Sequence, residues 1–112
     1  MRTARNLPMM SEAQLQTAVI QAARLLGWMV YHTYDSRRCE RGFPDLVLCK
    51  IPSQQASGNV AQGLIFVELK SQRGRLRREQ VVWITALRSA GQEVHVWRPR
   101  DLDEAIARLQ QS

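Results

Sequence analysis

Two short patterns in the chain carry charged residues that could act on a metal ion and a phosphate. Glu68 and Lys70 stand two residues apart in the segment LIFVELK (64–70), and Asp45 directly follows Gly-Phe-Pro at 42–44. Residues two apart in a β-strand share a face, so Glu68 and Lys70 point to the same side. If Asp45 begins a neighbouring strand, its carboxylate approaches that of Glu68, and paired oxygen ligands suit Mg²⁺ or Mn²⁺. A lysine nearby can orient or deprotonate a water, or balance charge on a phosphate.

The elements that must position these residues follow from periodicity and from turn residues. Ser11 and Gln14 form an S-x-x-Q capping box, which predicts a helix that ends at Gly27. Alternating and β-branched residues predict strands, and helical spacing predicts two further helices. The expected strands are 28–34, 45–51, 64–70 and 93–98, and the expected later helices are 76–90 and 102–110. In the helix over 76–90, we expect Val81, Trp83, Ile84 and Leu87 to face inward.

The order of these elements predicts an α/β fold with a mixed four-stranded sheet flanked by helices. The first three strands can form an antiparallel meander, and the fourth follows a helical crossover, so it can pair in parallel with the third. The 112 residues suit one domain, which we expect over 11–112 after a flexible segment at 1–10. The loop over 52–63 lacks periodicity.

The ordered motifs resemble the PD-(D/E)xK nuclease superfamily, and more narrowly its virus-type replication-repair nuclease (VRR-NUC) family. Members of that family have a helical glutamate, a G-x-P-D turn, an E-x-K strand and a glutamine on the next helix, and this chain resembles them in all four. Here the matching positions are Glu12, Gly42 to Asp45, Glu68 to Lys70, and Gln80. The resemblance implies a restriction-endonuclease-like core of order αβββαβ with an added C-terminal helix.

The same resemblance implies roles for these residues in metal-dependent hydrolysis of DNA. Asp45, Glu68, Lys70 and Gln80 are the expected catalytic set. The expected ligands of Mg²⁺ or Mn²⁺ are Asp45, Glu68, the carbonyl of Leu69 and, directly or through water, Glu12. Stand-alone proteins similar to this one act on branched DNA, including four-way junctions, and as homodimers, so we expect branched DNA and a second copy as partners.

Clustered arginines favour a polyanionic partner. The chain has 16 Lys and Arg residues against 10 Asp and Glu, a net charge of +6. The guanidinium fork matches phosphate geometry. The candidate DNA contacts are Arg37, Arg38, Arg41, Arg73, Arg75, Arg77 and Arg78, with Tyr31 and Tyr34 as further candidates. The alternative interpretation is a solvated basic surface without a partner.

Each candidate residue also has a purely structural interpretation. Asp45 could be a turn residue after proline, and Glu68 with Lys70 could be a surface ion pair. Glu12 could favour the helix dipole, and Gln80 could bond backbone. His32, His95 and the three tryptophans are interpreted as structural. Cys39 and Cys49 have neither a CxxC spacing nor partners for a zinc site.

The sequence therefore predicts a metal-dependent, structure-selective DNA endonuclease. We expect it to be intracellular and cytoplasmic, because no apolar run suggests a signal or a membrane span, and a bacterial or viral origin is consistent with the resemblance. The rival hypotheses are a monomeric flap or nicking endonuclease and a non-catalytic DNA-binding module. A protein-interaction adaptor gains no support beyond the size of the chain.

Overall fold

The computed structural model describes residues 9–33, 40–51 and 63–111. Four strands and three α-helices account for most of them, and the order predicted from the sequence is confirmed. In chain order the elements are α2 (Glu12–Leu25), β1 (Met29–His32), β2 (Leu46–Cys49), β3 (Leu64–Leu69), α3 (Arg78–Ser89), β4 (Glu93–Trp97), the 3₁₀ turn η1 (Pro99–Asp101) and α4 (Leu102–Leu109). None of the described helices is long and apolar enough to cross a membrane.

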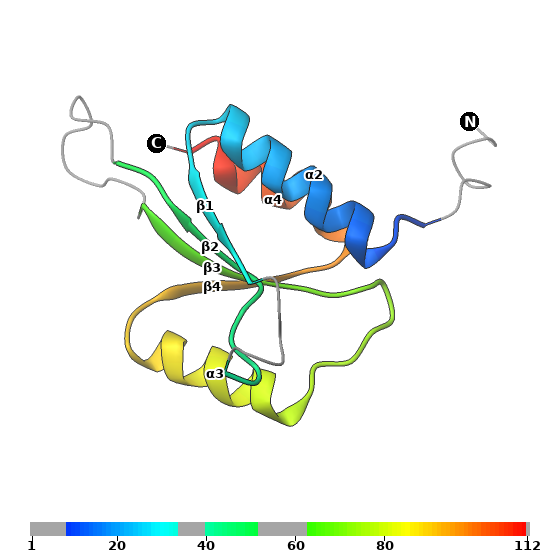
Figure 1. The fold of residues 1–112 in the computed structure, drawn as a ribbon, viewed down its shortest axis with the longest axis vertical. Helices are drawn as coiled ribbons and strands as arrows, with labels where there is room; N and C mark the ends of the chain where they lie inside the picture. The colour runs from blue at the N-terminus through cyan, green and yellow to red at the C-terminus, as the bar shows by residue number, and fades with distance from the viewer. Residues whose placement is uncertain (1–8, 34–39, 52–62, 112) are drawn as a thin grey trace.

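The strands form one mixed sheet in the order β1-β2-β3-β4. β1 pairs antiparallel with β2, β2 pairs antiparallel with β3, and β4 pairs in parallel with β3. Figure 1 shows α2 and α4 side by side over one face and α3 over the other. The fold is therefore the predicted α/β sandwich, with the chain between β3 and β4 crossing over through α3.

The main core lies between the sheet and the helix pair α2 and α4. It gathers apolar residues from α2, from alternate positions of β2 and β3, and from α4. The fully buried side chains of this core include Leu15, Val19, Leu46, Leu48, Ile65, Val67 and Leu109. β3 has a second buried face, because α3 covers its other side, and Glu68 lies on that second face.

The helix ends follow the expected local rules at α2. Ser11 accepts a hydrogen bond from the Gln14 amide at 3.1 Å, and the Gln14 side chain accepts one from the Ser11 amide at 2.8 Å. Gly27 closes the helix with φ +93°, a left-handed conformation that glycine adopts without a Cβ penalty. The predicted capping box and helix stop are confirmed.

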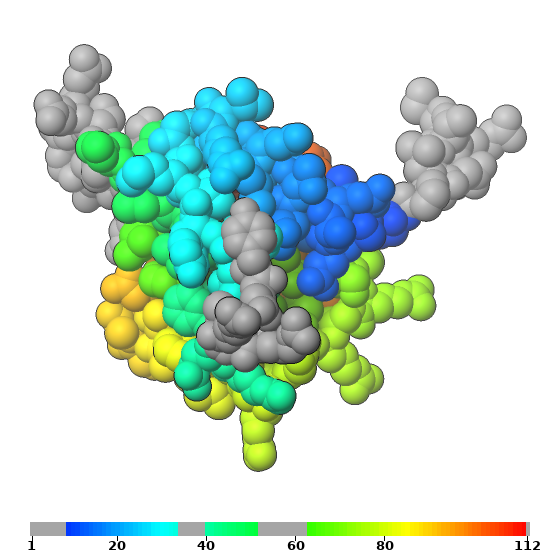
Figure 2. Space-filling view, in the orientation of Figure 1, coloured from blue at the N-terminus to red at the C-terminus, as the bar shows by residue number. Residues whose placement is uncertain are grey.

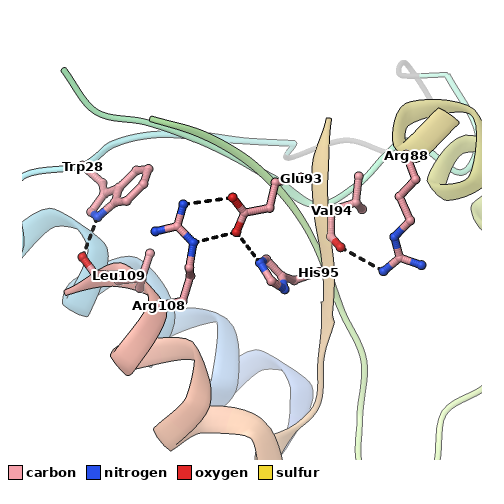
Figure 3. Close-up of polar contacts among 7 residues, drawn as sticks. All are labelled: Trp28, Arg88, Glu93, Val94, His95, Arg108 and Leu109. Carbon is pink, nitrogen blue, oxygen red and sulfur yellow. Dashed lines mark hydrogen bonds and ion pairs between the residues drawn. The ribbon is translucent and has the colours of Figure 1, made fainter. Parts of the chain in front are cut away.

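Polar contacts fasten α4 to the sheet (Figure 3). Arg108 donates two hydrogen bonds to the Glu93 carboxylate, at 2.6 and 2.9 Å, and His95 contacts the same carboxylate at 2.6 Å. The indole N–H of Trp28 donates to the Leu109 carbonyl at 2.9 Å. Trp28 and Trp97 are buried, as predicted, and His95 stacks on Trp97 in a structural role.

The structure corrects some boundaries and one side chain. β1 and β2 are shorter than predicted, and α3 begins at Arg78 rather than near residue 76. Val81 was predicted to face inward but is 46% exposed. At 100° per residue, it lies roughly 110° from the centre of the face that carries Gln80, Trp83, Ile84 and Leu87. Tyr34, Arg37, Arg38 and Cys39 and most of the 52–63 loop lie outside the described residues, so their predictions are not addressed.

Candidate active site

The pairing of β2 with β3 brings Asp45 opposite Glu68. The paired register of β2 and β3 ends at Leu46 opposite Val67, and the next pair outward is Asp45 with Glu68. Both side chains then lie on the face of the sheet that α3 covers, because cross-strand partners share a face. The predicted approach of the two carboxylates is confirmed.

The Gly-Phe-Pro turn holds Asp45 at the start of β2. Asp45 Oδ2 accepts a hydrogen bond from the Leu69 amide at 2.7 Å, which ties the turn to the end of β3. Gly42 has φ +87°, and a Cβ built on it would lie 2.4 Å from the carbonyl carbon and oxygen of Glu79. Only glycine allows the turn to approach the start of α3 this closely.

Aromatic packing supports the same turn. The ring of Phe43 meets Trp83 of α3 edge-on at 5.0 Å and Phe66 of β3 at 6.1 Å between centroids. Edge-to-face pairs of this kind add to the area that the rings bury. The turn is thereby wedged between the sheet and α3, and Asp45 is aimed inward.

Glu68 is 2% exposed and is held by one side chain of α3. Gln80 Nε2 donates a hydrogen bond to Glu68 Oε2 at 2.8 Å, and Gln80 Oε1 accepts a hydrogen bond from the Arg77 amide at 2.8 Å. Gln80 therefore faces the sheet, as its helical position predicted. Glu68 Oε1 is buried without a hydrogen-bond partner among the described residues, an expensive state for a carboxylate oxygen.

The electrostatics of the two carboxyl groups favour a shared cation. Burial, followed by the negative charge of Asp45, raises the pKa of Glu68 to about 8, with Lys70 opposing this and Glu12 adding to it. Burial also raises the pKa of Asp45, although the Leu69 amide and the charge of Lys70 offset part of the effect. Without a cation, the pair therefore retains a proton near neutral pH.

Lys70 is 8% exposed and lies immediately beyond β3, where its amide donates to the Trp97 carbonyl at 3.1 Å. Its positive charge acts on both Asp45 and Glu68. Because Glu68 and Lys70 are buried and Asp45 is half-buried, the three residues do not form a solvated surface ion pair.

The donor set fits a hard divalent cation that keeps some of its water. Two carboxylates, one with an unpartnered buried oxygen, supply the oxygen ligands that Mg²⁺ and Mn²⁺ prefer. Within the described residues, no three His, Cys, Asp or Glu side chains converge as a metal-binding group. Glu12 is exposed in the first turn of α2, and its charge acts on Glu68, so its role as a ligand, directly or through water, stays a prediction. Further ligands would come from the Leu69 carbonyl, water or substrate oxygens.

Exposed arginines follow the active strand. Arg73, Arg75, Arg77 and Arg78 are all exposed, and Figure 2 shows the yellow-green segment that includes them projecting long side chains from the molecular surface. Arg41 is also exposed and, with Arg77 and Gln80, lines a small pocket of about 70 Å³. Arg37 and Arg38 lie outside the described residues. The structure thus places five of the seven predicted arginines at the surface, on the segments that flank the carboxylates.

Two neighbours of the site were not predicted to matter. His32 lies near enough to act electrostatically on Asp45, and β1 pairing with β2 explains its position. Arg98 binds the turn that follows Lys70, donating to the carbonyls of Ser71 and Gly74. Their sequence signal is weak, since each contact joins segments far apart in the chain.

Comparisons with known proteins agree with the geometry. The family model for the VRR-NUC domain matches residues 3–101. A solved structure described as a VRR_NUC domain superposes with a TM-score of 0.63 at 22% identity, covering 86% of this chain and 94% of that chain. A second, described as a VRR_NUC domain protein, has a TM-score of 0.66 at 17% identity and covers 92% and 88%. At these identities the two structures support the fold alone. The search of curated proteins gave no match.

Proposed function

The chain belongs to the VRR-NUC domain family, a family of nuclease-type domains, and we propose that it is a divalent-metal-dependent endonuclease acting on branched DNA. The observation that carries the proposal is the group of Asp45, Glu68 and Lys70, in which Glu68 and Lys70 are buried, Asp45 is half-buried, and one Glu68 oxygen has no hydrogen bond among the described residues. Burying Glu68 and Lys70 beside the half-buried Asp45 costs free energy that the fold alone does not require.

Each residue has a task that its contacts support. Asp45 and Glu68 would hold Mg²⁺ or Mn²⁺, which when bound polarises the phosphate and lowers the pKa of a coordinated water. Gln80 keeps the Glu68 carboxylate in one orientation through its 2.8 Å hydrogen bond. Lys70 would position the attacking water and stabilise the charge that develops on the phosphate.

The exposed arginines support a nucleic-acid substrate recognised by its backbone. Arg41, Arg73, Arg75, Arg77 and Arg78 are exposed and free to reach phosphates, which carry no base information. We propose a four-way junction as the substrate and a homodimer as the active form, because twofold symmetry would set two such sites for paired cuts. Both proposals rest on the family resemblance.

A cleavage panel tests the proposal. Labelled four-way junction, flap, splayed arm, linear duplex and single strand are incubated with Mg²⁺, with Mn²⁺ and with EDTA. We expect metal-dependent cutting that Lys70→Ala lowers by about 10²- to 10³-fold. Lys50→Ala is the matched control, because Lys50 lies over the Trp28 ring rather than beside the carboxylates.

The same panel separates the alternatives. Equal rates on flap, duplex and junction would remove the junction preference, and cutting of one strand by a monomer would favour the nicking enzyme. Tight junction binding without cleavage in either metal would favour the non-catalytic DNA-binding module and would refute the roles given to Asp45, Glu68 and Lys70.

A further inference from the structure

The turn that follows Lys70, residues 71–74, packs directly against the lysine side chain. A Cβ built on Gly74 would lie 2.7 Å from the Ser71 hydroxyl and 3.6 Å from Cδ of Lys70. The Gly74 amide also donates to the Ser71 carbonyl at 3.3 Å, which closes the turn. Gly74 therefore lies close to the aliphatic part of Lys70, so a shift of the turn would change the space beside that side chain.

One side chain holds both ends of this turn. Arg98 Nη1 donates to the Ser71 carbonyl at 2.8 Å and to the Gly74 carbonyl at 2.6 Å. A hydrogen bond from a charged donor is stronger than a neutral one, and here two come from a single nitrogen. Arg98 is itself anchored, because its amide donates to Asp101 Oδ2 at 2.8 Å.

A second, weaker attachment joins the same two segments. Gln72 Oε1 accepts a hydrogen bond from the Arg100 amide at 3.1 Å. The turn after the active strand thus offers three acceptor oxygens to the segment between β4 and α4, and two of them accept from Arg98. None of these contacts reaches the carboxylates, so their effect on the site must pass through Lys70.

We propose that Arg98 is a positioning residue for Lys70. Its guanidinium fixes the 71–74 turn. The fixed turn then confines the Lys70 ammonium beside Asp45 and Glu68. The inference rests on the proposed nuclease function. Without the two donors, the turn can move away from Lys70, and displacements of about 1 Å in a catalytic group can cost about 10²-fold in rate.

Two substitutions at Arg98 separate positioning from simple packing. Arg98→Met keeps much of the side-chain length but has no donor. Arg98→Lys keeps a charged nitrogen that can donate to both carbonyls, because the native contacts also come from one nitrogen. Single-turnover cleavage with enzyme in excess over DNA should fall about 10- to 100-fold for Arg98→Met and recover to within about 5-fold of wild type for Arg98→Lys.

Arg88→Met is the matched control. Arg88 also donates to a backbone carbonyl, that of Val94 at 2.9 Å (Figure 3), but from the last turn of α3 and not to the 71–74 turn. It should cleave at the wild-type rate. Hydrogen–deuterium exchange gives a readout independent of cleavage: the amides of 71–75 should exchange faster in Arg98→Met and not in Arg88→Met.

The outcomes are distinct. If wild type cuts no DNA, the proposed function fails, and the role of Arg98 in catalysis fails with it. If wild type cuts and Arg98→Met matches its saturated rate, only the positioning role is overturned. Equal losses in Arg98→Met and Arg98→Lys would also overturn it, because the donor would then not matter. Should Arg98→Met not fold, Arg98→Gln replaces it, because it removes the charged donor from the turn, and an unchanged saturated rate in that variant would count against the inference.

Discussion

Replacing Glu68 by Gln should stabilise the metal-free protein at pH 8 while abolishing cleavage. Burial and the charge of Asp45 raise the pKa of Glu68 from 4.5 to about 8. A carboxyl group whose folded-state pKa is raised contributes stability that is complete below the unfolded value and is lost as pH rises through the folded value. The stability of the metal-free wild type should therefore fall between pH 4.5 and 8 through this group.

The size of the effect follows from the shift. Linkage sets an upper limit of about 5 kcal/mol at pH 8. Solvent screening and relaxation around the carboxylates reduce the measurable loss to about 2 kcal/mol. For a domain of this size, that corresponds to roughly 10 °C in the melting temperature. Gln avoids the loss, because it does not titrate, can still accept the hydrogen bond from Gln80 and can donate to Asp45.

The assay is thermal unfolding in EDTA at pH 5, 6, 7 and 8, followed by circular dichroism. The difference between the melting temperatures of Glu68→Gln and wild type should be small at pH 5 and grow toward pH 8. Groups far from position 68 titrate alike in both proteins, so the difference reports the pair formed by Glu68 and Asp45. Adding Mg²⁺ at pH 8 should raise the melting temperature of wild type more than that of the variant, because a ligand stabilises the state that binds it.

A difference that stays flat with pH, or a variant less stable than wild type at pH 8, would refute the reasoning. Glu104→Gln is the control, since Glu104 is an exposed carboxyl on α4. If that substitution gives the same pH-dependent gain, the effect comes from net charge and not from the burial of Glu68 beside Asp45.

Three further predictions follow from particular contacts. Gly42→Ala should cost about 2 kcal/mol or more in urea unfolding and lower cleavage, whereas Gly91→Ala, also at positive φ but with nothing within 4 Å, should cost about 1 kcal/mol. Gln80→Ala should lower the single-turnover rate about 10-fold with little change in DNA affinity, because it frees the catalytic glutamate to reorient. Burial alone would raise the pKa of Glu93, but hydrogen bonds from Arg108 and His95 outweigh it and hold that pKa below its usual range. The stability contributed by Glu93 is therefore present above about pH 4.5 and lost as pH falls, and Glu93→Gln should be destabilising at pH 7 by an amount that shrinks toward pH 3, as urea unfolding would measure.

Local rules made the elements and the centre of the site predictable. The Ser11 capping box and Gly27 mark the ends of α2 through backbone groups within a few residues. The period of two along β3 places Glu68 and Lys70 on one side, and antiparallel pairing with the preceding strand brings Asp45 to them. Each of these inferences needs only neighbouring residues or neighbouring strands, so the sequence is sufficient for them.

Contacts across layers were not predictable in the same way. The exposure of Val81 is an exception, because helical spacing alone sets it roughly 110° from the face that carries Trp83 and Ile84. The approach of Gly42 to the Glu79 backbone and the hold of Arg98 on the 71–74 turn join segments that are 24 to 37 residues apart. The action of the Glu12 charge on Glu68 likewise joins the first turn of α2 to β3, across the two layers.

The site and the core compete for the same strand. Ile65, Val67 and Leu69 turn one face of β3 into the core under α2 and α4, while Glu68 occupies the other face under α3. A strand covered on both sides usually has a continuously apolar sequence, because any polar side chain on it loses its contact with water. The chain keeps a carboxylate there and compensates with Gln80, Lys70 and the Asp45 partner, yet one oxygen still has no hydrogen bond among the described residues. Stability and affinity for a cation must therefore oppose one another at position 68, and a substitution that improves the metal-free fold should weaken the reaction.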